Sequence, residues 1–224
     1  MIVKESQRIG LIVPSVNSVM EPDFYRHLPQ NVSLHTARMY IDEVTVAGEE
    51  RMLDKFVLPA ARDLSTVRPH VVVFGCTSAG ALRGCEYDQK MCARISAVTR
   101  SPVVSVIESV NEALAAMNAK KVLILTPYVD ELNQRIKCSI EEAGLEVLDI
   151  FGLGISDGFD LAQVGVDKIV QFAREKTQGL NPDCLFVSCT NFRALEALPQ
   201  LKAAFGPRVV TSNQAAYDKV LSLL

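Results

Sequence analysis

The chain has 224 residues, 49% of them hydrophobic and 22% charged, which is the composition of a globular protein large enough to bury a core of its own. Its apolar runs, such as Val71–Phe74, are far shorter than the roughly 20 residues that cross a bilayer, so we expect no membrane partner. The 23 basic and 26 acidic residues nearly cancel and form no basic stripe, which excludes nucleic acid as an expected partner. No secretion signal marks the first residues, and we expect a cytoplasmic protein.

Short runs of β-branched residues alternate along the chain with longer stretches of helical spacing, a pattern typical of parallel strands joined by crossover helices. We expect strands at residues 8–13, 33–40, 71–75, 103–106, 121–126, 145–151, 184–188 and 208–211. Between the fifth and sixth of these, Leu132, Ile136 and Ile140 recur at four-residue spacing, which predicts a helix over residues 129–143 that ends at Gly144. The expected fold class is therefore α/β, with parallel sheets covered by helices on both faces.

The second half of the sequence repeats the first. Three pairs of residues are separated by the same 113 positions: Pro14 and Pro127, Pro69 and Pro182, and Cys76 and Cys189. Two copies of one α/β unit predict two halves related by a pseudo-twofold axis, with the C-terminal ends of both sheets facing a shared cleft, where ligands of such sheets bind. We expect residues 1–105 with 209–224 to form the first half and residues 106–208 to form the second.

Two of the six cysteines occupy equivalent places in the two halves. Cys76 and Cys189 each follow a buried strand and precede an expected helix, whose N-terminus would favour the reactive thiolate. A single cysteine in such a place is often a small core residue, but the matched pair predicts two catalytic thiols that face each other across the cleft. The residues after them carry hydroxyl and amide groups suited to a carboxylate: Thr77, Ser78, Thr190 and Asn191. We expect the other four to be ordinary packing or surface thiols: Cys85, Cys92, Cys138 and Cys184.

The first loop of each half supplies one further polar candidate. Asn17 follows the first strand and Tyr128 follows its counterpart, so each can place a neutral hydrogen-bond donor over the cleft; a turn-forming asparagine and a packing tyrosine fit the same spacing. The three histidines have no metal-ligand spacing, and we expect no metal. The glycine-rich residues 152–158 lack both dinucleotide and Walker spacing, so no nucleotide cofactor is expected.

Together these motifs resemble the aspartate/glutamate racemase superfamily, in particular its branch of maleate cis-trans isomerases and arylmalonate decarboxylases. The resemblance covers almost the whole chain and rests on five strings: RIGLIVPSVN at residues 8–17, GCTS at 75–78, TPY at 126–128, CTNFRAL at 189–195 and TSNQA at 211–215. It implies two flavodoxin-like (Rossmann-like) halves around a cleft, no metal or organic cofactor, and two thiols that act from opposite sides of the substrate.

The residues at the cysteine sites favour one branch of that superfamily. Arylmalonate decarboxylases typically have glycine in place of the first cysteine, and glutamate racemases typically have histidine where this chain has Asn191. Maleate isomerases keep both cysteines together with residues like Asn17 and Tyr128. One departure is Gly158, near which those isomerases have an asparagine, and this leaves open how one substrate carboxylate is held.

The resemblance thus implies a cofactor-independent isomerase of a small dicarboxylate. The hypothesis is that the Cys76 thiolate adds to an alkene carbon of a maleate-like substrate, rotation follows, and elimination gives the trans product. Cys189 serves as the opposing acid or base, while Asn17 and Tyr128 anchor the carboxylates. An amino-acid or hydantoin racemase with the same cysteines, an arylmalonate-type decarboxylase and a non-catalytic small-molecule binding module are alternatives. A homo-oligomer is compatible with the numerous apolar helix faces.

Overall fold

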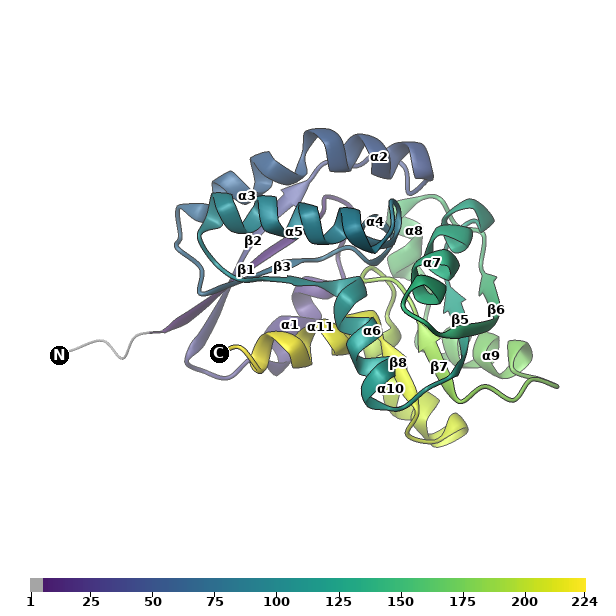
Figure 1. Ribbon diagram of the computed structural model, residues 1–224. Coiled ribbons are helices and arrows are strands. Elements are labelled where there is room, and N and C mark those ends of the chain that lie inside the picture. The colour runs from purple at the N-terminus through teal and green to yellow at the C-terminus, as the bar shows by residue number, and fades with distance from the viewer. Residues whose placement is uncertain (1–5) are drawn as a thin grey trace.

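The computed structural model describes residues 6–224, which form two four-stranded parallel sheets flanked by helices (Figure 1). The elements around the first sheet are β1 (Gln7–Pro14), α1 (Met20–His27), β2 (Val32–Met39), α2 (Val46–Lys55), α3 (Val57–Ser65), β3 (Val71–Phe74), α4 (Thr77–Ala81), α5 (Cys85–Thr99), β4 (Val103–Ser105) and α6 (Val106–Ala116). The remaining elements are β5 (Lys121–Thr126), α7 (Asp130–Glu142), β6 (Glu146–Gly152), α8 (Gly158–Gln163), α9 (Val166–Lys176), β7 (Cys184–Val187), α10 (Ala194–Phe205), β8 (Val209–Thr211) and α11 (Ser212–Leu221). None of the helices within residues 6–224 is long and apolar enough to cross a membrane.

The two sheets have the same strand order, which confirms the prediction of a repeated α/β unit. The orders are β2-β1-β3-β4 and β6-β5-β7-β8, and every expected strand is found within one residue at either end. In each sheet the order reverses at the centre, between β1 and β3 and between β5 and β7. The loops that leave such a reversal point diverge to opposite faces and open a crevice at the C-terminal strand ends.

The central strand β1 is buried on both faces because alternate residues of a strand point to opposite sides of its sheet. Ile9, Leu11 and Val13 pack with Phe24 of α1 and with residues of α11 on one face. Ile12 belongs to the larger core on the other face. Figure 1 shows α2, α3 and α5 above the first sheet and α1 and α11 below it. This double cover explains why the strands read as nearly continuous apolar runs.

The C-terminal segment crosses back towards the first sheet slightly later than residue 209. β8 pairs in parallel with β7, so residues 209–211 complete the second sheet as the counterpart of β4. The chain then returns in α11, which packs against α6 and α1, and Gln7 Nε2 donates a hydrogen bond to Leu224 O at 2.6 Å. The division of the whole chain into two domains stays a prediction. The chain returns to the first half at the start of α11 and not at residue 209.

Candidate active site

The loops that follow β1, β3, β5 and β7 meet between the two sheets and enclose a small cavity. Hydrogen bonds join the two halves there: Asn17 Nδ2 donates to Thr190 Oγ1 at 3.0 Å, and Thr190 Oγ1 donates to Gly75 O at 3.1 Å. The cavity measures about 20 Å³, which is room for roughly one water molecule. Its walls are formed by Pro14, Val16, Asn17, Ile41, Val44, Glu49, Cys76, Ser78, Tyr128, Leu161, Cys189, Thr190 and Asn191. Every candidate residue from the sequence is among them except Thr77.

Cys76 lies directly after β3 and is the N-cap residue of α4. The preceding Gly75 lets the end of β3 pass close to β1, because a Cβ atom there would lie 2.8 Å from Ile12 O and 2.8 Å from Val13 Cγ1. The Cys76 side chain is buried, and its Sγ lies 3.6 Å from Ser78 Oγ. This close strand packing holds the thiol at the C-terminal end of the sheet, facing the second half.

Cys189 has a backbone conformation that is rare for a residue with a side chain. Its φ is 103°, in the left-handed region that favours glycine, and the strain is held by surrounding hydrogen bonds. The Cys189 N–H donates to Ser212 Oγ at 3.1 Å, and the Asn191 N–H donates to Cys189 Sγ at 3.2 Å. Strained non-glycine residues cluster at active sites, and here the strain fixes the direction of the thiol into the cavity.

Both thiols are protonated in this environment, contrary to the expectation that helix N-termini favour their thiolates. Burial raises the pKa of the Cys76 thiol well above its ordinary value, and the neighbouring Glu49 carboxyl raises it further. Burial likewise raises the pKa of Cys189 to about 12. The helices offer little compensation, since α4 has only 5 residues and α10 begins only at Ala194. None of the described residues that line the cavity is a lysine, arginine or histidine. A nucleophilic thiolate in this cavity therefore needs a base.

Two asparagines tie the walls of the cavity together. Asn17 Oδ1 accepts hydrogen bonds from the N–H groups of Val19 and Met20 at the start of α1. Asn191 Nδ2 donates to Val16 O at 3.3 Å and to Gly158 O at 2.7 Å, so both of its amide hydrogens are used within the protein. Asn17 thus keeps one amide hydrogen for a ligand, while the Asn191 side chain builds the wall.

Tyr128 and Ser78 line the cavity, whereas Thr77 does not. The hydroxyl of Tyr128 is 3.4 Å from Ser78 Oγ, and both line the cavity. Burial raises the pKa of Tyr128 well above its ordinary value, so its hydroxyl stays protonated and can donate. Thr77 instead donates to Ser212 Oγ at 2.9 Å, and this serine accepts the Cys189 N–H. Thr77 therefore supports the backbone of Cys189 from the opposite half.

Glu49 is a cavity residue that the sequence analysis missed. It lies on α2, is 1% exposed, and its Oε1 accepts a hydrogen bond from Ser78 Oγ, whereas its Oε2 is buried without a hydrogen-bond partner. Burial raises its pKa from 4.5 to about 8. The burial of Glu49 could have been inferred from the sequence, because Glu49 shares the apolar, buried face of α2 with Met52 and Leu53, three and four residues on. A carboxyl on the apolar face of a helix is a candidate functional group.

Gly158 differs in role from what the resemblance suggested. A Cβ atom on this residue would lie 2.5 Å from Val16 Cγ2 and 2.7 Å from Val16 Cβ, so a side chain here would meet the wall rather than the cavity. Its carbonyl oxygen accepts the hydrogen bond from Asn191. The contribution of α8 to the cavity wall comes from Leu161.

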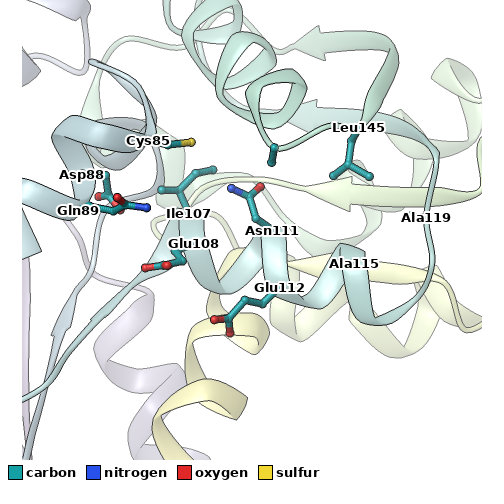
Figure 2. Close-up of a pocket in the computed structure, with 11 residues that line it drawn as sticks. Cys85, Asp88, Gln89, Ile107, Glu108, Asn111, Glu112, Ala115, Ala119 and Leu145 are labelled. Carbon is teal, nitrogen blue, oxygen red and sulfur yellow. The ribbon is translucent and has the colours of Figure 1, made fainter.

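A larger cavity of about 420 Å³ lies elsewhere, between α5 and α6 near the start of β6 (Figure 2). Cys85 and Asp88 of α5 and Glu108 and Asn111 of α6 are among its lining residues. Burial raises the pKa of Asp88 to about 7. Neither Cys76 nor Cys189 reaches this cavity, and it lies away from the reversal points of both sheets. The two-thiol cavity is therefore the candidate active site.

Residues 9–224 match the arylmalonate decarboxylase family. The chain belongs to this family. It is similar to a maleate isomerase of Geobacillus stearothermophilus, with 26% identity over 231 residues that cover 97% of this chain and 91% of the relative. Its fold is that of two solved structures. One is a maleate isomerase of Pseudomonas putida S16 with maleate, at a TM-score of 0.90 and 24% identity, covering 97% of this chain and 91% of that one. The other is a mutant of Nocardia farcinica maleate cis-trans isomerase with a covalently bound succinylcysteine intermediate, at a TM-score of 0.87 and 22% identity, covering 97% and 92%.

Proposed function

We propose that the chain is a cofactor-independent isomerase that converts a small cis-enedioate such as maleate into its trans isomer. The observation that carries the proposal is the pair Cys76 and Cys189, which come from equivalent strand ends of the two sheets and line one buried cavity. The similarity to a maleate isomerase over 97% of the chain supports maleate as the first substrate to test.

In the proposed reaction Cys76 is the nucleophile. Its thiolate forms an S–C bond to one alkene carbon, and the electron pair of the double bond moves onto the neighbouring carbon and its carboxylate. The former double bond is now single and can rotate. When the electron pair returns, the C=C bond reforms in the trans geometry and the S–C bond breaks, so no atom is gained or lost. Such a covalent step divides one difficult isomerisation into two easier ones. The succinylcysteine of the Nocardia farcinica relative is an adduct of this kind.

The other cavity residues have supporting roles in this proposal. Cys189 lies on the opposite wall as a neutral thiol, which suits it to donate a proton to the carbanionic carbon and to accept it back. Tyr128, Ser78 and the remaining amide hydrogen of Asn17 donate hydrogen bonds to the carboxylates, where charge grows as the adduct forms. The cavity is too small for an enedioate as it stands, so binding has to open it. The Val44 N–H donates to Ser156 O at 2.9 Å across the two halves, so this bond joins a residue of the cavity wall to the opposite half.

The family match also supports a second candidate, decarboxylation of an arylmalonate, in which the Cys189 thiol protonates the carbanion left by carbon dioxide. A racemase would use the two thiols to remove and return a proton at one chiral carbon. Proton NMR in deuterium oxide distinguishes the three. Isomerisation of maleate gives the trans olefinic signal, racemisation of aspartate, glutamate or a hydantoin exchanges the α-proton, and phenylmalonate decarboxylation gives a new benzylic signal.

The test of the proposed function is this NMR assay on the purified protein and on a double variant with Cys76→Ser and Cys189→Ser. We expect maleate turnover by the wild-type chain and none by the double variant. Absence of turnover by the wild-type chain with maleate, together with exchange or decarboxylation of another acid, would replace the proposal by the corresponding reaction. A binding module would bind its ligand equally well with and without the two thiols and turn over none of these acids.

A further inference from the structure

We propose that Glu49 is the proton acceptor that generates the Cys76 thiolate, and that it acts through the hydroxyl of Ser78. The inference rests on the proposed function in that it assigns Cys76 the role of nucleophile. The Cys76 thiol is buried, and no lysine, arginine or histidine stands among the described residues that line its cavity, so it needs a base to lose its proton. Glu49 reaches Cys76 only through Ser78, so it acts on the nucleophile indirectly, as a positioning residue.

The three side chains form a continuous line from α2 to the end of β3. Cys76 Sγ lies 3.6 Å from Ser78 Oγ, within reach of a sulfur hydrogen bond, and Ser78 Oγ is hydrogen-bonded to Glu49 Oε1. All three side chains are buried, at 4%, 1% and 1% exposure for Cys76, Ser78 and Glu49. A serine hydroxyl can accept one proton and donate another, so this line is suited to carry a proton from sulfur to carboxylate.

Glu49 also retains an atom that the folded protein does not use. Its Oε2 is buried and has no hydrogen-bond partner, although a buried carboxyl without partners is costly to maintain. The carboxyl lines the same cavity as both thiols, so it is poised for a proton or a ligand group. Nothing in the packing of α2 requires a carboxyl here, since the same helix face is otherwise filled by Gly48, Met52 and Leu53.

The other ionisable groups around Glu49 stay protonated over the same pH range and therefore cannot accept the proton. Within the cavity these are Cys76, Cys189 and Tyr128, and burial raises the pKa of each of them, that of Cys189 to about 12. The pKa of Glu49 is about 8, so it is the cavity group that ionises first as the pH rises. The charged groups on the outer side of α2 are paired away from the cavity, with Arg83 bonded to Glu50 and Asp54.

The proton transfer balances without a further reactant. Ser78 Oγ accepts the thiol proton of Cys76 as its own hydroxyl proton passes to Glu49 Oε1. The products are a Cys76 thiolate and a neutral Glu49 carboxylic acid, so one negative charge moves from carboxylate to sulfur within the cavity. After the trans product leaves Cys76, the same protons return along the same line.

The experiment measures the rate at which iodoacetamide alkylates Cys76 between pH 6 and pH 10, quantified by peptide mass spectrometry. Cys76 loses its proton as iodoacetamide forms the S–C bond, so the rate reports a base that accepts this proton. The assay requires no knowledge of the substrate, and its outcome is independent of whether maleate is turned over. Cys189 in the same sample measures access to the cavity. We expect the Cys76 rate of the wild-type chain to rise up to about pH 8 and to level off above it as Glu49 becomes fully ionised, whereas the Cys189 rate keeps rising to pH 10. In Glu49→Gln and in Ser78→Ala the levelling near pH 8 should disappear and the rate at pH 8 should fall by about 100-fold, as for the loss of a general base. Glu49→Asp keeps a carboxylate and should keep a rate that levels off with pH.

A purely electrostatic role for Glu49 predicts the opposite sign. Its negative charge raises the pKa of Cys76, so removing that charge would make the thiolate easier to form and alkylation faster. A Cys76 rate in Glu49→Gln that equals or exceeds the wild-type rate would overturn the proposal. So would an equal slowing of Cys76 and Cys189, because it would indicate a closed or distorted cavity. If the wild-type chain shows the expected alkylation of Cys76 but does not turn over maleate, the result counts against the proposed function and leaves the role of Glu49 standing.

Discussion

Replacing Glu49 with glutamine should change how the stability of the protein depends on pH. Burial raises the pKa of this carboxyl from 4.5 to about 8. Between those values the folded protein binds a proton that the unfolded chain has released, so the free energy of unfolding falls as the pH rises. The loss is about 1.4 kcal/mol for each pH unit, so between pH 5 and pH 8 the wild-type chain loses about 4 kcal/mol relative to Glu49→Gln. The glutamine variant is neutral throughout and escapes this loss.

The assay is urea unfolding at pH 5, 6, 7 and 8, followed by circular dichroism because the chain has no tryptophan. At each pH the free energy of unfolding of the wild type is subtracted from that of the variant, since the remaining titrating groups are common to both proteins. Glu50→Gln is the matched control: it is the next residue of α2, lies on the outer face and pairs with Arg83. As a surface ion pair it should contribute about 0–1 kcal/mol, with little dependence on pH.

The reasoning is refuted if the free energy of unfolding of Glu49→Gln, relative to the wild type, stays constant within about 1 kcal/mol from pH 5 to pH 8. That result would indicate a carboxyl with an ordinary pKa, which is already largely ionised at pH 5 in both the folded and the unfolded chain. A difference that grows as expected would show that the wild-type chain gives up stability to keep a carboxyl in the cavity. Such an exchange is common at functional sites.

Substitutions at two positions of the site and at one exposed cysteine give three further predictions. Gly158→Asn should lower the free energy of unfolding by about 1–3 kcal/mol through its clash with Val16, whereas Gly165→Ala, where nothing lies within 4 Å of the added Cβ, should leave it nearly unchanged; equal urea midpoints would contradict this. Asn17→Ala should cost about 1 kcal/mol in the same assay because α1 loses its cap and Thr190 Oγ1 loses the hydrogen bond from Asn17; an unchanged urea midpoint would contradict this. Cys138→Ser alters an exposed thiol and should leave NMR-measured turnover at the wild-type rate; a large loss would extend the thiol chemistry beyond the cavity.

Most of the architecture was predictable because it depends on local pattern and on the repeat. The apolar, β-branched runs predict the strands within one residue, and the 113-residue spacing pairs Cys76 with Cys189, which line the same cavity. In parallel sheets the residues after each strand gather at one edge, so Asn17 and Tyr128 could also be assigned to the cleft.

The parts that escaped prediction depend on packing between distant segments. Glu49 enters the site only because α2 lies over the end of β3, and its approach to Ser78 has no local sequence signal. Ser212 holds the strained backbone of Cys189 from the start of α11, although the spacing of the repeat gives no reason to single it out. The protonated state of the thiols follows from burial by both halves together, whereas the sequence suggested helix ends that favour thiolates.

The nucleophilic role of Cys76 is tested most directly by trapping its adduct. The wild-type chain and the Cys189→Ser variant are incubated with maleate, and the modified residue is located by peptide mass spectrometry, with Cys76→Ala assayed for turnover by proton NMR. We expect a mass increase equal to that of the substrate on the peptide that carries Cys76, and no turnover by Cys76→Ala. Full turnover by Cys76→Ala, or an adduct found only on Cys189, would contradict the proposed mechanism.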